Sequence, residues 1–120
     1  YMFYGCHNFN EYLNDWNTEN LKYINYMFAY CINFNKNLNN WNISKLQSCR
    51  GTFLNCRNFN QDFSNWNINN ICEITEMFSY CILLNTDYTH WNLKHIKKEN
   101  KNFAFNRCDN LNENYYPKYL

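Results

Sequence analysis

Seven cysteines and three histidines are the side chains of this sequence that could bind a metal or act as a nucleophile and its base. A structural zinc site needs ligands in closely spaced pairs. The neighbours Cys6 and His7, and the pair His90 and His95, lack that spacing. Four of the cysteines recur singly, at one fixed interval: Cys6, Cys31, Cys56 and Cys81. We therefore expect no metal and no other cofactor.

Nucleophilic catalysis needs a thiol or hydroxyl with a base in reach. The three histidines, His7, His90 and His95, occupy unrelated places in the repeating pattern described below. Nothing in their spacing pairs one of them with a particular nucleophile. We therefore expect the protein not to be an enzyme.

Four tryptophans recur at the same interval as the four cysteines, at Trp16, Trp41, Trp66 and Trp91. An exposed row of indoles could bind sugars or stacked bases, because aromatic faces bind both. Repeated large aromatic side chains also define the core of proteins built from stacked copies. We favour the core, with a carbohydrate-binding tryptophan ladder as the alternative.

The whole chain follows a period of about 25 residues, and fixed periods of roughly 20–50 residues are typical of stacked arrays. The copies span residues 2–26, 27–51, 52–76 and 77–101, with a degenerate C-terminal cap at 102–120. Together they predict a single repeat domain. One further position is phenylalanine in every copy and another is asparagine: Phe3, Phe28, Phe53, Phe78 and Phe103, then Asn10, Asn35, Asn60 and Asn85.

The spacing of apolar residues predicts one helix and one strand in each copy. Leu21, Ile24, Phe28 and Cys31 are spaced as one face of an α-helix, and Thr18, Ser44 and Asn69 or Asn70 are suitable N-caps. Trp41 and Ile43 then alternate as in a strand. The predicted fold is an α/β, leucine-rich-repeat-like solenoid of about four and a half strand-turn-helix repeats with parallel strands.

Stacking would give the repeated polar residues a structural role. An asparagine at the same turn of every copy can bond the backbone of its own and the next copy, because buried polar groups must be paired. Helices of neighbouring copies should lie about 10 Å apart. A disulfide needs Cα atoms closer than about 7 Å. We therefore expect the cysteines to be small buried hydrophobic residues, which favours a reducing intracellular or viral setting.

Composition excludes several classes of partner. The formal net charge is +1, so no basic surface for nucleic acid is predicted. No run of about 18 apolar residues could span a membrane. No signal peptide is visible, and because the chain opens on Tyr1 in mid-repeat we expect it to be a piece of a longer protein.

The pattern MF-x-x-C-x-x-F-N-x-x-L-x-x-W-N, followed by an aliphatic pair three apart, resembles the 25-residue repeat of BspA-like leucine-rich repeat surface proteins. These are also described as a mycoplasma lipoprotein-type domain of unknown function. The resemblance runs from Met2 to about Leu111. It implies a solenoid found mostly on bacterial surfaces and carries no catalytic residue. The chain departs from it in having cysteine where alanine is frequent, and Trp-Asn in place of Trp-Asp.

The last full copy differs from the others. Lys94, Lys97, Lys98 and Lys101 form a basic cluster with His95, which we interpret as a solvated helix face. Glu99 stands where Ile24, Cys49 and Ile74 stand in earlier copies. A charge at that position predicts that the stack ends there, with the last helix turned toward solvent.

We expect a protein-protein interaction or surface recognition module that binds through its strand face, with a protein as the partner. Specificity in such stacks lies in the residues that vary between copies. Beside the tryptophans these are Asn14, Asp15, Asn39, Asn40, Ser64, Asn65, Thr89 and His90. Tyrosine-rich edges such as Tyr23, Tyr26 and Tyr30 also suit protein contact. The alternatives are a carbohydrate-binding adhesin and a structural spacer or virion component.

Overall fold

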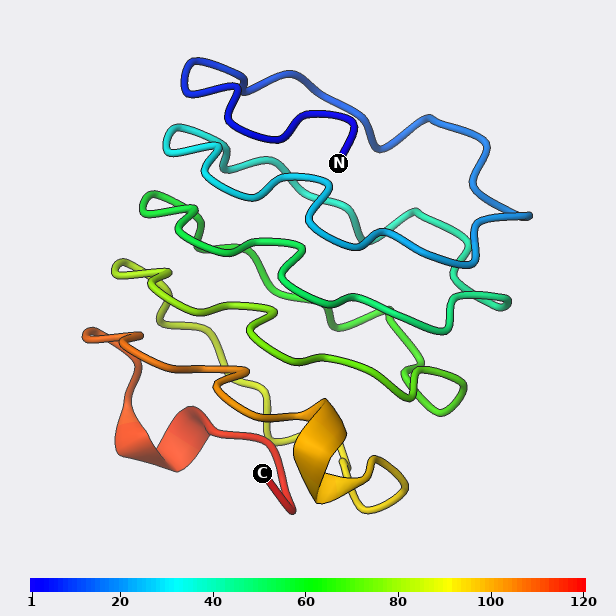
Figure 1. Cartoon of the computed structure of the whole chain (residues 1–120), viewed down its shortest axis with the longest axis vertical. Helices are drawn as coiled ribbons and strands as arrows, with labels where there is room; N and C mark the ends of the chain where they lie inside the picture. Colours follow the sequence, from blue (N-terminus) through cyan, green and yellow to red (C-terminus); the bar gives the residue numbers. More distant parts are fainter.

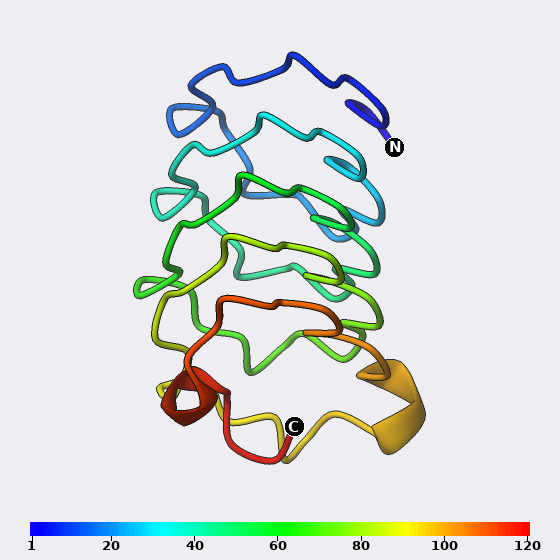
Figure 2. The ribbon, with the colours of Figure 1, turned by 90° about the vertical axis from the view of Figure 1, so that its left-hand side faces the viewer.

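The computed structural model describes residues 1–120, in which the chain winds into coils stacked in order from the N-terminus to the C-terminus (Figure 1). We call one passage of the chain around the stack a rung. A view from the side shows the corners of successive rungs lying over one another (Figure 2). Segments separated by one period of the sequence are therefore spatial neighbours along the whole chain.

The predicted α/β solenoid is wrong, because the rungs contain neither α-helices nor strands. The helical elements are two short 3₁₀ turns, η1 (Lys98–Asn100) and η2 (Glu113–Tyr115). Strand-like pairing is confined to isolated parallel bridges, Tyr23 with Ser48, Ser48 with Glu73, and Asn92 with Lys118. Neither helical turn is long and apolar enough to cross a membrane.

Consecutive tight turns produce the spacing that resembles a helical face. The amide of Met27 donates to the carbonyl of Ile24, and the amide of Cys31 donates to that of Phe28. Each of these bonds closes a turn over three residues, so inward-facing side chains recur at intervals of three and four. An α-helix has the same intervals, which is why the periodicity indicated one.

Residues with left-handed backbone angles prevent those turns from joining into a helix. Tyr26 has a φ of 56° and Tyr30 a φ of 62°. Helices of L-residues do not continue through such angles. The intervening amides instead bond the following rung: Tyr26 donates to the Arg50 carbonyl at 2.8 Å, and Phe28 to the Thr52 carbonyl at 3.0 Å. The backbone is thus satisfied between rungs rather than within a helix.

The predicted strands beside Trp41 and Trp66 are absent because their amides bond locally, and beside Trp91 only the isolated bridge of Asn92 with Lys118 forms. The Trp41 amide donates to the Leu38 carbonyl, and the Ser44 amide donates to Asn42 Oδ1 at 3.0 Å. Ser44 is therefore capped by the preceding asparagine and is not a helix N-cap. The alternation itself is real, since Trp41 and Ile43 are buried while Asn42 is exposed.

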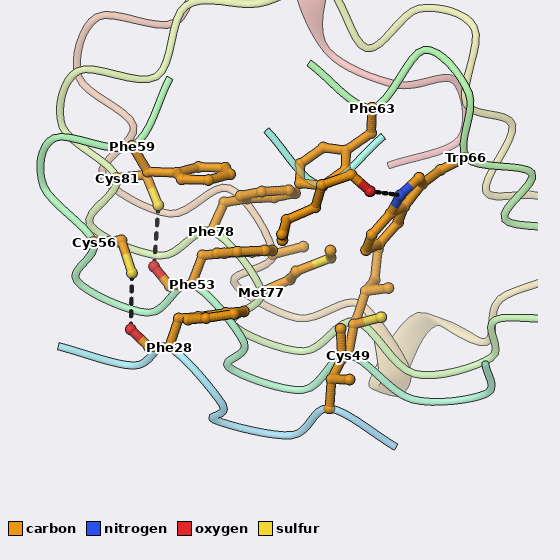
Figure 3. Close-up of a cluster of buried hydrophobic side chains, with 14 of the residues drawn as sticks. Phe28, Cys49, Phe53, Cys56, Phe59, Phe63, Trp66, Met77, Phe78 and Cys81 are labelled. Atoms are coloured by element: carbon orange, nitrogen blue, oxygen red, sulfur yellow. Dashed lines mark hydrogen bonds between the residues drawn. The ribbon is translucent and has the colours of Figure 1, made fainter. Parts of the chain in front are cut away.

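Two columns of stacked rings fill the core. Phe28 and Phe53 stack at a ring-centroid distance of 5.6 Å, and Phe53 and Phe78 at 5.5 Å (Figure 3). The second column includes Phe34 and Phe59, 5.8 Å apart. Rungs therefore lie much closer together than the spacing of about 10 Å expected from helix packing. Direct backbone hydrogen bonds between rungs are the reason.

The register of the last copy differs from the prediction by two residues. The Phe53 amide donates to the Met77 carbonyl, one residue short of a full period, whereas the Phe78 amide donates to the Ala104 carbonyl, one residue beyond it. The turn η1 accommodates the extra residues. Phe105, which is 5% exposed, therefore extends the phenylalanine column, whereas Phe103 is 64% exposed. Placing Phe103 in that column was wrong.

The same insertion accounts for the charge in the last copy. Glu99 lies inside η1 and does not occupy the position of Ile74 in a turned-out helix. With the two-residue shift, that position belongs to Lys101. Its ammonium donates to the carbonyl of Tyr119, and Lys94 Nζ lies 5.7 Å from the Tyr119 ring centroid. The basic cluster is thus partly engaged by the C-terminal residues.

Asparagine side chains connect every rung to the next, as predicted. Asn10 Oδ1 accepts a hydrogen bond from the Asn35 amide at 2.8 Å, and Asn35 Oδ1 accepts from the Asn60 amide at 2.9 Å. The ladder continues through Asn85 to Asn112, at 2.8 and 3.0 Å. Its last member, Asn112, again shows the two-residue shift.

Candidate functional site

The residues predicted to contact a partner form two adjacent columns at one corner of the rungs. We call Asn14, Asp15, Asn39, Asn40, Ser64, Asn65, Thr89 and His90 the corner surface. In one column the hydroxyls of Ser64 and Thr89 donate to Asp62 and Asp87, whereas the two asparagines serve the backbone. Asn14 is buried and its Oδ1 accepts from the Asn40 amide at 2.8 Å. Asn39 Oδ1 likewise accepts from the Asn65 amide at 3.3 Å. These side chains hold the corner together and are not free for a partner.

The other column of the corner surface is exposed, at Asp15, Asn40, Asn65 and His90. Beside it lies a shallow cavity of about 380 Å³ that includes Asp62 and Asp87. The pKa of Asp62 is lowered by the Asn39 side-chain amide and then by the Ser64 amide. The pKa of Asp87 is lowered by the Thr89 hydroxyl and backbone amide. Both carboxylates are therefore already bonded within the chain.

Tryptophan is core at three of its four positions. Trp41, Trp66 and Trp91 are 2–4% exposed, and only Trp16 in the first rung is 43% exposed. Trp66 Nε1 donates to the Leu38 carbonyl at 3.0 Å (Figure 3), and Trp41 Nε1 donates to Leu13. These indoles present no exposed ladder to a sugar.

Trp91 Nε1 is the exception, because it is buried without a hydrogen-bond partner. The carbonyl equivalent to that of Leu38 belongs to Phe63, which lies 3.4 Å from His90 Nε2. Buried polar groups without a partner are uncommon. The indole of the last tryptophan is thus held by packing without a hydrogen bond.

The cysteine column is also structural. Cys56 Sγ donates to the Phe28 carbonyl at 2.9 Å and Cys81 Sγ to the Phe53 carbonyl at 3.1 Å (Figure 3). All seven cysteines are free, and Cys31, Cys56 and Cys81 are buried as predicted, whereas Cys6 is exposed. Burial raises the pKa of Cys31 to about 11 and that of Cys108 to about 12. Such thiols are poor nucleophiles, since the thiolate is the reactive form.

The histidines lie apart, and two of them face backbone carbonyls. His95 Nε2 lies 2.9 Å from the Ile71 carbonyl, and His90 Nε2 faces that of Phe63. No group of three or more His, Cys, Asp or Glu side chains is placed to hold a metal ion. Neither arrangement resembles a nucleophile with its base.

An open groove on another face was missed from the sequence. It has a volume of about 520 Å³ and crosses four rungs, between Tyr30 at one end and Phe103 at the other. The groove is lined by Tyr30, Asn55, Arg57, Glu76, Tyr80 and Phe103, among others. Tyr30, Tyr80 and Phe103 are 37%, 43% and 64% exposed. The groove therefore combines exposed aromatic rings with one positive and one negative side chain.

The sequence held a signal for this groove. The positions four residues apart that carry Tyr26 and Tyr30 become Gly51 and Asn55 in the next copy, then Glu76 and Tyr80. All six have φ between 56° and 63°. A phenylalanine and a cysteine recur in every full copy, but the residue types at these neighbouring positions change. A position whose residue type changes between copies is expected to face outward. Of these six positions, Tyr26 and Tyr30 are among the tyrosines that the sequence predicts to contact a partner.

The fold and these surfaces define a protein of stacked irregular rungs whose repeated columns are structural and whose variable columns face outward. Residues 1–118 match the family described as "Mycoplasma protein of unknown function, DUF285". The chain belongs to that family, which agrees with the broader part of the predicted resemblance. Comparison with curated proteins and with solved structures gave no match.

Proposed function

We propose that this chain is a non-enzymatic recognition module that binds a partner protein across the groove. The observation that carries the proposal is the cluster of exposed rings, Tyr30, Tyr80 and Phe103, around one groove. Tyrosine and phenylalanine are enriched in protein interfaces. The predicted contact through a strand face is replaced by this groove, since the rungs have no strands.

Backbone rigidity supports the same function. The Tyr30 amide donates to the Leu54 carbonyl at 2.7 Å, and the Tyr80 amide donates to the Asn106 carbonyl at 2.8 Å. The groove residues therefore stand on a backbone bonded at each rung, and a preorganised surface loses less entropy on binding. The BspA-like surface relationship belongs to this proposal, supported by the repeated Phe, Cys, Asn and Trp positions.

Site-specific photocrosslinking tests the proposal. A photoreactive amino acid replaces Asn55 in the groove, Asn65 on the corner surface, or Asn69 on neither, and each protein is illuminated in extract of its source cells. We expect one partner protein to be crosslinked from position 55 alone. Unlabelled chain should compete with this product, and a Tyr80→Ala chain should compete much less.

Two results would contradict the groove as the contact. A product formed from position 65 but not from position 55 would transfer recognition to the corner surface. Crosslinks only between copies of this chain, at every position, would favour a structural spacer instead.

A further inference from the structure

One column of the groove contains a hollow the size of a side chain. Its members, one from each rung, are Gly5, Tyr30, Asn55, Tyr80 and Arg107, of which Tyr30, Asn55 and Tyr80 line the groove. All have positive φ, between 58° and 72°, so the backbone takes a left-handed conformation at this point of each rung. Asn55 is short and stands between two tyrosines. The hollow therefore opens at its level, in the groove that all three side chains line.

The neighbouring column shows how this protein fills such a hollow. There a tyrosine also precedes a small residue, and the ring of Tyr26 lies against Gly51. The Tyr26 hydroxyl accepts a hydrogen bond from Arg50 Nε at 3.1 Å and donates to Glu76 at 3.5 Å. A phenol ring thus occupies the space above the small residue, with its hydroxyl bonded to charged neighbours.

At Asn55 the arrangement differs, because the centroid of the Tyr30 ring lies 5.5 Å from that of the Tyr4 ring in the preceding rung. The Asn55 side chain accepts a hydrogen bond from Arg57 Nε at 3.0 Å, which holds the two side chains together. Tyr30 and Tyr80 remain more than one-third exposed. The space between them is part of the open groove.

Ring spacing in the core indicates what would fit. Phe28, Phe53 and Phe78 stack at one ring per rung, 5.5–5.6 Å apart. Tyr30 and Tyr80 are two rungs apart, so a planar ring inserted at the level of Asn55 would have a neighbour on each side at about that spacing. Stacked aromatic pairs at such distances are favourable beyond their buried area.

The charges of the groove favour an uncharged ring within a polypeptide. Arg57 and Glu76 contribute one positive and one negative side chain, and neither is in an ion pair, since the ion pair of this chain joins Arg107 and Asp109. A polyanion or polycation would meet one unfavourable charge. A guanidinium can also lie against an aromatic face.

We propose that the groove receives an aromatic side chain of the partner protein, tyrosine or tryptophan, inserted between Tyr30 and Tyr80 over Asn55. This inference rests on the proposed function and specifies what the partner inserts. Such a side chain has a planar ring and a hydrogen-bonding group at its edge. These are the two features by which the Tyr26 ring occupies the space above Gly51. The partner's ring would then lie at the level of Asn55, between the levels of Tyr30 and Tyr80.

An NMR titration of the whole chain with small probes tests the inference. The probes are N-acetyl-tryptophanamide and N-acetyl-tyrosinamide, with N-acetyl-leucinamide and maltotriose as controls. We expect both aromatic amides to shift the ring signals of Tyr30 and Tyr80, and the controls to leave them unchanged. Tyr30→Ala combined with Tyr80→Ala should weaken aromatic binding about tenfold.

The decisive variant is Asn55→Tyr. Tyr30 and Tyr80 adopt the same left-handed backbone in this column, so the substitution should fold, which an unchanged melting temperature would verify. It should fill the hollow and abolish binding of the aromatic amides. Asn69→Tyr, outside the groove, is the matched control and should bind like the unmodified chain.

Other outcomes would overturn the inference. Equal shifts with the leucine and aromatic amides would show an unselective apolar surface, and shifts with maltotriose alone would identify a glycan site. Persistent aromatic binding in the folded Asn55→Tyr variant would place the probe elsewhere. If crosslinking from position 55 succeeds while aromatic amides do not bind, protein recognition stands and the inserted ring fails.

Discussion

The ring of Tyr26 lies against the α-carbon of Gly51 in the following rung, where any β-carbon would collide with it. Gly51 also has a φ of 56°, an angle that favours glycine. The glycine is therefore favoured by its backbone angle, which Tyr26 and Glu76 share in this column, and required by the ring above it. The contact secures Tyr26 between Arg50 and Glu76 beside the groove.

Gly51→Ala should destabilise the fold by about 2–4 kcal/mol, combining left-handed strain with displacement of the Tyr26 ring. The measurement is urea unfolding followed by tryptophan fluorescence. Gly5→Ala is the matched control, since Gly5 has a φ of 72° but no atom within 4 Å of the added carbon. It should cost only about 1 kcal/mol.

A Tyr26→Ala background separates the two causes. There, Gly51→Ala should cost about as little as Gly5→Ala, because only the backbone strain remains. If the cost of Gly51→Ala stays the same without the tyrosine ring, the contact is not the reason for the glycine.

The tryptophan column allows a comparison within one residue type. Trp66→Phe removes the indole donor to the Leu38 carbonyl, which keeps its hydrogen bond from the Trp41 amide, whereas Trp91→Phe removes an Nε1 that has no partner. Both changes remove similar apolar volume. Trp66→Phe should therefore cost about 0.5–1.5 kcal/mol more in unfolding free energy than Trp91→Phe, the net value of one hydrogen bond. Equal costs would mean that the Leu38 bond contributes little.

Two phenylalanines test the register of the last rung. Phe105→Ala should destabilise the protein by about 3–5 kcal/mol, because Phe105 is buried next to Phe78 at a centroid distance of 5.1 Å. Phe103→Ala should change stability by less than about 0.5 kcal/mol, as expected of an exposed side chain. Thermal unfolding of the two variants distinguishes this register from an uninterrupted period, which predicts the reverse order.

Alkaline pH should destabilise the fold through its buried thiols. Burial raises the pKa of Cys108 from 9.0 to about 12, and raises the pKa of Cys56 and Cys81 well above 9.0. A raised folded pKa gives stability that is full below pH 9 and is lost as the pH rises toward the folded value. In that window each thiol should lower the unfolding free energy by about 1.4 kcal/mol per pH unit.

The Cys108→Ala variant isolates one thiol. It should be less stable than the unmodified chain at pH 7, because the bond from Cys108 Sγ to the Phe78 carbonyl is lost. Between pH 9 and 12 its unfolding free energy, measured with denaturant under reducing conditions, should fall less steeply. Parallel curves for the two proteins would exclude Cys108 as a source of the alkaline loss.

Periodicity predicted the relationships between copies better than the structure within one copy. Asn35 bonds the amide of Asn60, and Trp41 and Trp66 are core, because a position repeated in every copy constrains what neighbouring copies share. Helices could not be distinguished from consecutive turns, because both place apolar side chains three and four residues apart. The left-handed angles of Tyr26 and Tyr30 decide between them, and tyrosine gives no sign of such angles.

The groove depends on a different kind of information. The fifth copy contains Asn-Phe-Ala-Phe-Asn, in which Phe103 and Phe105 fit an apolar position equally well by type. Which of the two is buried is decided by the backbone hydrogen bonds between rungs after η1. That choice exposes Phe103 and brings it to the end of the groove opposite Tyr30.

Hydrogen bonds between distant parts of the sequence almost all join one rung to its neighbour. The response of the chain to a pulling force should therefore be stepwise. Pulled apart by its two ends in an optical trap, the chain should give way in discrete steps, each a single rung peeling from the next. Each step should release about 25 residues of chain, or roughly 80–90 Å of contour length. Under load the chain would lengthen while its remaining rungs stay folded.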